Sequence, residues 1–192
     1  MCIRDSPEDN VLLTLQYYAT GSFIRVGGDF HGIHVSTAGK IVKDVSEALA
    51  ALRPDFIFMP ESEIEIKQIR QEFYNIAKFP SCIGALDCSH IRIRSPGGAD
   101  PEIYCNGKNF FSINVQTISD AMLCIQNIVA RRPGCSHDTT IFKNSAIKRQ
   151  FDSGKFKDNV LVGDSGYPAL KYLITPMLNP VTEVDNLFNE SQ

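Results

Sequence analysis

The stretch "GALDCSHIRI", residues 84–93, has the alternation of a buried β-strand but carries an acid, Asp87, within it. Burying an ionised carboxylate costs several kcal/mol unless the group is paired or binds a metal. A second apolar run, "VLVGDSGYP" at 160–168, leads into another acid, Asp164. We therefore predict that Asp87 and Asp164 meet in space and hold divalent cations.

The segments around these two stretches predict a mixed sheet. Short apolar or alternating runs bounded by Gly, Pro, Asn and Asp occupy residues 82–93, 110–120, 122–134 and 160–168. The second and third runs are joined tightly by "SDA", which predicts an antiparallel hairpin. One amphipathic helix, ending near Ser153-Gly154, is expected before the fourth run. This order predicts an α/β fold with helices on the faces of the sheet and the two acid-bearing strands side by side.

Residues 7–78 have helical periodicity. We predict a helix from Pro7 to about Thr20, a second with Ser36 as its N-cap, and a third opened by a capping box of Ser62 and Glu65. The Gly-rich "VGGDFHGIHVS" would join short helices, either as a DNA-binding helix-turn-helix or as a plain packing unit. The pattern alone favours the packing unit.

Composition limits the class of protein. With 192 residues, 43% of them apolar and 21% charged, the chain resembles an ordinary globular protein, and it has no run long enough to cross a bilayer. Its six cysteines occur singly, which argues against a zinc module or disulfide framework and favours a reducing, intracellular compartment. The net charge of −3 counts against nucleic-acid binding. The opening "MCIRDS", residues 1–6, fits no periodicity, so we expect it to be non-native or disordered.

Asp138, at the start of the expected helix, is a third candidate acid. Each acid also has a structural interpretation: Asp138 would cap its helix, and Asp164 would form a turn. Asp87 is the hardest to explain structurally, because Asp has poor strand propensity. Converging carboxylates repel each other unless cations neutralise them, and oxygen-preferring Mg²⁺ is the natural occupant.

Four blocks, "GALDCSHIRI", "NGKNFFSINVQTISDA", "RRPGCSHDTTIFKNS" and "LVGDSGYPALKYLITPMLNP", together resemble the DDE transposase domain of the PIF/Harbinger superfamily and its domesticated nuclease relatives. Residues 12–49 are similar to the N-terminal helical region of that family. The resemblance implies an RNase H-like core, metal-dependent cleavage of DNA, and a nuclear location. It also favours the helix-turn-helix interpretation. An accessory DNA-binding protein as a further partner and the oligomeric state are left open.

Carried over to this chain, the resemblance makes Asp87 and Asp164 catalytic, and Asp87, Asp138 and Asp164 ligands of Mg²⁺ or Mn²⁺. His137 is expected in a loop or supporting role, and Asp120 in a structural role at the hairpin. Candidates for a patch that faces DNA phosphates are Arg92, Arg94, Arg131, Arg132, Lys143, Lys148 and Arg149. For any one of them taken alone, a solvated surface position is the favoured explanation.

The family's last catalytic acid is a Glu on a later helix, which the residues up to Gln192 do not reach. Glu183 and Glu190 precede that position in the family pattern. We therefore expect a helical region at 7–78 and a nuclease core at 79–192 that is incomplete at its C-terminus and impaired in cleavage. The alternative function is a domesticated, sequence-specific DNA-binding module without catalysis.

Overall fold

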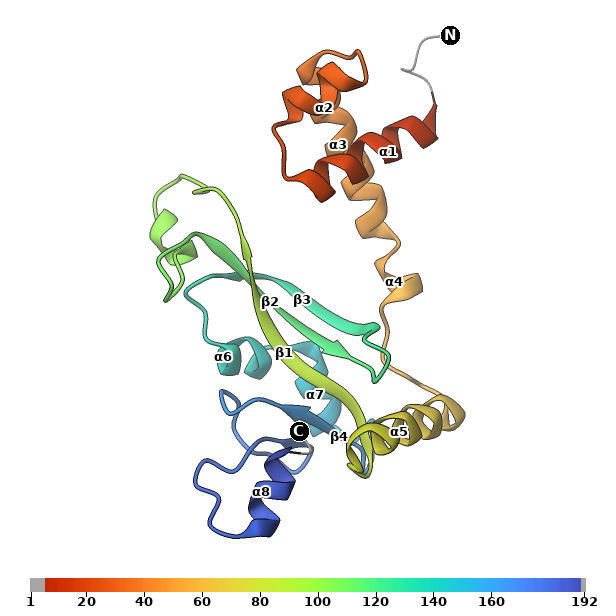
Figure 1. The fold of residues 1–192 in the computed structure, drawn as a ribbon, viewed down its shortest axis with the longest axis vertical. Helices are drawn as coiled ribbons and strands as arrows, with labels where there is room; N and C mark the ends of the chain where they lie inside the picture. The colour runs from red at the N-terminus through yellow and green to blue at the C-terminus, as the bar shows by residue number, and fades with distance from the viewer. Residues whose placement is uncertain (1–5, 191–192) are drawn as a thin grey trace. The chain divides into compact units, whose positions relative to one another are not determined.

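The computed structural model describes residues 6–190, which divide between Phe56 and Ile57 into two compact units. The expectation for residues 1–6 lies outside the described residues except at Ser6, which directly precedes the first helix. Figure 1 shows the helical first unit and the sheet-containing second unit. The helix at 63–77 groups with the sheet, whereas its sequence pattern had placed it with the helical region at 7–78.

The first unit consists of α1 (Pro7–Thr20), α2 (Ile24–Phe30), α3 (Val35–Ala51) and the short α4 (Arg53–Phe56). The predicted first helix is confirmed, and Gly21 ends it in the left-handed conformation with a φ of 58°. The prediction that the Gly-rich segment only connects helices was wrong, because its first half belongs to α2. Helix α3 is capped by His34, whose side chain accepts a hydrogen bond from the Ser36 backbone, so the prediction of Ser36 as N-cap was wrong.

Close packing explains why the Gly-rich segment is helical. A side chain at Gly28 would place its Cβ 2.9 Å from the Ile33 carbonyl oxygen, so only glycine lets α2 approach the following turn. The buried side chains of Leu13, Ile33 and Ala38 form the small core of this unit. Local glycine propensity is therefore overridden by tertiary packing.

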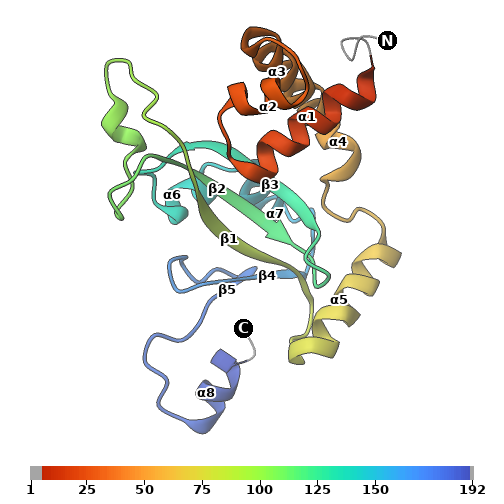
Figure 2. The ribbon, with the colours of Figure 1, turned by 45° about the horizontal axis from the view of Figure 1, so that its top comes forward.

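The second unit is built on a five-stranded mixed sheet in the order β3-β2-β1-β4-β5. Its strands are β1 (Cys82–Arg92), β2 (Ser112–Ser119), β3 (Ile125–Pro133), β4 (Val160–Gly163) and β5 (Leu173–Ile174). Strands β1, β2 and β3 pair antiparallel, and β4 pairs parallel with β1 and β5, as Figures 1 and 2 show. The α/β class, the hairpin and the neighbouring acid-bearing strands are confirmed, and the two-residue β5 is an addition.

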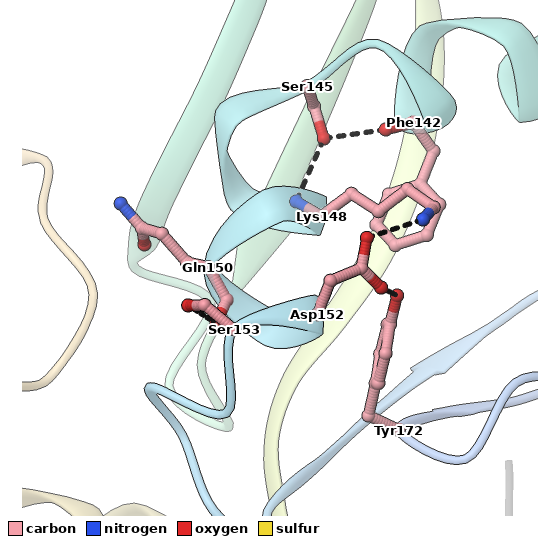
Figure 3. A network of polar contacts seen from close by, with 7 residues as sticks. All are labelled: Phe142, Ser145, Lys148, Gln150, Asp152, Ser153 and Tyr172. Atoms are coloured by element: carbon pink, nitrogen blue, oxygen red, sulfur yellow. Dashed lines mark hydrogen bonds and ion pairs between the residues drawn. The ribbon is translucent and has the colours of Figure 1, made fainter.

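The segment between β3 and β4 forms two helices, α6 (Asp138–Lys143) and α7 (Ala146–Asp152), where one was predicted. Ser145 separates them, because its hydroxyl accepts a hydrogen bond from the Lys148 backbone and donates one to the Phe142 carbonyl (Figure 3). Asp152 then fixes α7 through an ion pair of 2.6 Å with Lys148 and a hydrogen bond from the Tyr172 hydroxyl.

Helices α6 and α7 pack on one face of the sheet, and α5 (Glu63–Ala77) packs beside β1 (Figures 1 and 2). The capping box of Ser62 and Glu65 at the start of α5 is confirmed. The core joins all these elements and includes Ile66, Ile83, Leu86, Ile118, Phe142, Phe151, Leu161 and Leu173. A 3-10 turn (η2, Pro101–Tyr104) and α8 (Glu183–Glu190) complete the unit.

Candidate active site

Asp87 and Asp164 lie at equivalent positions on neighbouring strands. The last residue pair of the parallel β1–β4 ladder joins Leu86 and Gly163, and each acid follows its member of that pair. Both acids are exposed, and both line one pocket of about 270 Å³. The other residues that line this pocket are Ala85, Leu86, Val162, Gly163, Pro176 and Asn189. The structure therefore brings together the two carboxylates that the sequence pattern had singled out.

The turn after β4 holds the Asp164 carboxylate in place. Its Oδ1 accepts a hydrogen bond of 3.0 Å from the Gly166 backbone, and its carbonyl accepts one from the Tyr167 backbone. The predicted turn-forming role is therefore present. Because this turn uses Oδ1, the remaining oxygen, Oδ2, is left to bind a ligand.

Helix α8 and the chain that precedes it form another part of the pocket wall. Pro176 and Asn189 line the pocket, and Asn189 ties α8 to that chain by accepting a hydrogen bond of 2.8 Å from the Met177 backbone. The ring of Phe188 lies 5.9 Å from that of Phe79, next to the start of β1. Contacts far apart in sequence thus support the pocket.

Asp138 is not brought to this pocket. It is the first residue of α6, after the N-cap His137, so the prediction that it caps the helix was wrong. Its Oδ1 accepts a hydrogen bond of 2.8 Å from the amide of Asn114, a residue of β2 that is almost fully buried. Asn114 pairs with His90 of β1. Because side chains alternate along a strand, Asn114 and His90 face the side opposite to Asp87.

The donor set of the pocket fits a hard divalent cation in part. Among residues 6–190, no three side chains of His, Cys, Asp or Glu converge closely enough to hold a metal ion. Mg²⁺ is commonly held by one or two carboxylates, with water and substrate phosphate as its other ligands. The carboxylates of Asp87 and Asp164 meet that requirement for one ion.

Comparison with known proteins identifies the family. The family described as "DDE superfamily endonuclease" matches residues 86–191. The chain belongs to this family. The match includes Asp87, Asp138 and Asp164, and together with the five-stranded sheet it supports the RNase H-like fold and the DDE transposase resemblance that the sequence predicted.

Several curated proteins are similar to this family member over nearly its whole length. "Putative nuclease HARBI1" of Rattus norvegicus is 33% identical over 97% of the chain and 53% of its own length, and that of Homo sapiens is 33% identical over 96% and 52%. "Protein ALP1-like" of Arabidopsis thaliana is 26% identical over 89% of the chain and 45% of its own length. The chain thus spans about half the length of the curated relatives it matches. No solved structure matches it.

The sequence pattern missed the buried polar side chains on the opposite face of the sheet. The Tyr167 hydroxyl donates a 3.2 Å hydrogen bond to Cys88, and burial raises the pKa of the Cys88 thiol to about 12. Burial also raises the pKa of Tyr167, so neither group ionises at neutral pH. Alternation in "SINVQTI" was a usable signal, because it places Asn114 and Gln116 on the same face as the buried Ile118.

The other predicted residues have varied positions. The Oδ1 of Asp120 accepts hydrogen bonds from the Met122 and Cys124 backbones, which agrees with a structural role in the hairpin. The Lys148 ammonium is engaged by Asp152, and the Arg92 guanidinium lies 4.7 Å from the centre of the Phe110 ring. None of the predicted basic residues lines the pocket of the two acids. No helix within residues 6–190 is long and apolar enough to cross a membrane.

Proposed function

We propose that this chain is part of a metal-dependent DNA endonuclease in which Asp87 and Asp164 hold Mg²⁺ or Mn²⁺ against a phosphodiester. The observation that carries the proposal is the parallel pairing of β1 and β4, which brings both exposed carboxylates to one pocket. Membership of the DDE endonuclease family supports the same chemistry. DNA as the partner and the nucleus as the location belong to this proposal.

The protein's part in the reaction is positioning and charge. A bound divalent ion would neutralise the phosphate and activate the attacking oxygen. The β1 ladder fixes the backbone of Asp87, and the turn through Gly166 holds the Asp164 carboxylate, so the places of the two acids on the sheet are set before any ligand arrives. Such pre-organisation accounts for much of the catalysis in phosphoryl transfer.

Asp138 remains the third candidate ligand. The hydroxyl of its neighbour Thr139 donates a hydrogen bond of 2.6 Å to the Gly166 carbonyl, in the same turn that orients Asp164. Helix α6 is therefore joined to the acid-bearing turn, although the Asp138 carboxylate is engaged by Asn114. Two-metal cleavage needs more oxygen ligands than Asp87 and Asp164 provide, so we propose that the 192-residue chain cleaves DNA slowly.

Plasmid nicking tests this proposal. We compare the wild-type chain, Asp87→Asn and the control Asp100→Asn, which changes an exposed acid that caps no backbone group through its side chain. Slow nicking that needs Mg²⁺ or Mn²⁺, disappears in Asp87→Asn and persists in Asp100→Asn is the expected result. DNA affinity measured in EDTA should be equal in all three. Nicking that ignores Asp87 or the metal would refute the assignment, and fast nicking would refute the proposed impairment.

The alternative function, a DNA-binding module without catalysis, is favoured by one observation in the first unit. Helices α2 and α3 are separated by only four residues, His31 to His34, as in a helix-turn-helix. The same experiment separates the two functions. Metal-independent DNA binding by all three proteins, with no nicking by any of them, would favour the binding module.

A further inference from the structure

A second cleft in the sheet-containing unit lies between α5 and the residues that lead into β1. It has a volume of about 480 Å³, and neither Asp87 nor Asp164 lines it. The lining residues are Glu63, Ile66, Lys67, Arg70, Gln71, Tyr74, Pro80 and Ser81. Its walls therefore carry two cations, one anion and several neutral hydrogen-bonding groups.

The charges in this α5 cleft do not cancel. Glu63 is already neutralised by an ion pair with Lys157 from outside the cleft, whose hydrogen bond and charge hold the pKa of Glu63 below its usual range. Lys67 and Arg70 form no ion pair with any carboxylate among residues 6–190. The charge of Arg70 adds a smaller effect on Glu63 to that of Lys157, and the cleft as a whole keeps a net positive charge for an anionic ligand.

Hydrogen-bond donors in the cleft are arranged around Arg70. Its Nη2 donates a hydrogen bond of 2.9 Å to the Ser81 hydroxyl. This bond fixes the guanidinium beside the start of β1 and leaves its other N–H groups to bind a ligand. Tyr74 adds a phenolic hydroxyl, and the Lys78 ammonium lies 5.4 Å from the centre of its ring. A planar guanidinium beside an ammonium and hydroxyls is a donor set suited to phosphate oxygens.

We propose that the α5 cleft binds a backbone phosphate of the DNA whose cleavage is assigned to Asp87 and Asp164. This inference rests on the proposed function, and it names a contact that the acid pocket does not provide. Ser81 directly precedes β1, and Asp87 lies six residues further along the chain. Because an extended strand rises about 3.3 Å per residue, the two sites are at most about 20 Å apart, which corresponds to about six base pairs of duplex at 3.4 Å each.

The test is the salt dependence of DNA binding in EDTA, measured by fluorescence anisotropy. We compare the wild-type chain with Lys67→Gln/Arg70→Gln and with a control of equal charge change, Lys108→Gln/Lys171→Gln, in which both lysines are exposed. Each lost phosphate contact reduces the slope of log K against log salt by about 0.9, so the cleft variant, which loses one phosphate contact, should lose about 0.9. The control should lose less than half of that, and far-UV circular dichroism should show both variants folded.

Three outcomes would overturn the proposal that the α5 cleft binds a DNA phosphate. The first is an unchanged salt slope in the cleft variant, and the second is an equal loss of slope in the control. The third is tight binding of inorganic phosphate to the α5 cleft without any effect of the cleft variant on DNA affinity. The last result would assign the cleft to free phosphate. Failure of the cleft is distinguishable from failure of the proposed function, because metal-dependent nicking that requires Asp87 would persist. A wild-type chain that binds no DNA would refute both.

Discussion

Replacing Gly84 by alanine should damage the strand pairing on which the acid pocket depends. Gly84 lies on β1 opposite Leu161 of β4, three residues before Asp87. An added Cβ would lie 2.5 Å from Cγ2 of Ile118 and 3.0 Å from Cδ2 of Leu161. Both neighbours are fully buried, so neither side chain can move away without disturbing the core.

The size of the effect follows from this overlap. Carbon atoms pack best at about 3.5–4.0 Å, so the Cβ would overlap Ile118 by about 1 Å. Overpacking of a dense core costs about 1–3 kcal/mol, and two buried neighbours place Gly84→Ala in the upper half of that range. In a chain of this size, about 2–3 kcal/mol lowers Tm by about 4–12 °C. Because the overlap strains β1 against both β2 and β4, and β1 and β4 carry the two acids, affinity for Mn²⁺ should fall as well.

Calorimetry and Mn²⁺ titration of Gly84→Ala measure both effects. The matched control is Gly107→Ala, because an added Cβ at Gly107 meets no atom within 4 Å. The control should keep its Tm within about 2 °C of wild type, as is usual for surface substitutions. If Gly84→Ala were as stable as Gly107→Ala, the packing that places the two acids side by side would have been misread.

Three further predictions concern the surroundings of the site. Asn114→Ala should lower the free energy of unfolding by about 1–3 kcal/mol in urea titrations, because it removes two hydrogen bonds of a buried amide. The control Asn186→Ala, at an exposed position, should lower it by less than about 0.5 kcal/mol. Equal effects of the two substitutions would contradict this. At pH 8, iodoacetamide should modify exposed Cys124 rapidly and Cys88 only after unfolding, since the Cys88 pKa is raised to about 12, and equal rates read by mass spectrometry would refute that protection. Hydrogen bonds from Lys148 and Tyr172, with the charge of Lys148, lower the pKa of Asp152, so its contribution to stability is present above the ordinary carboxyl pKa of 3.8 and is lost on acidification. The free energy of unfolding of Asp152→Asn should therefore fall less than that of the wild type between neutral and acidic pH. Parallel losses in the two proteins would contradict this.

Local patterns predicted the features that depend on neighbouring residues. The alternating runs located four strands, and the spacing of Ser62 and Glu65 located the start of α5, because both signals arise within a few residues. The pairing of β1 with β4 was predicted from the cost of burying Asp87 without a partner. The pairing is present, but both acids are exposed, so the burial of a charge is not its physical cause.

The features that were missed depend on tertiary contacts. Gly27 and Gly28 have poor helix propensity, but close packing against the first-unit core makes α2 helical. The break at Ser145 between α6 and α7 preserves the apolar rhythm on both sides, so periodicity could not reveal it. The position of Asp138 depends on a hydrogen bond from Asn114, 24 residues away, for which the chain has no local signal.

Calorimetric titration with Mn²⁺ tests the central claim most directly. The wild-type chain and Asp100→Asn should bind one ion with the same affinity, whereas Asp87→Asn and Asp164→Asn should each lose at least tenfold in affinity, which is about 1.4 kcal/mol. Asp138→Asn should weaken binding less, because that carboxylate lies outside the pocket of the two acids. Undiminished Mn²⁺ binding by Asp87→Asn or Asp164→Asn would contradict a shared cation site.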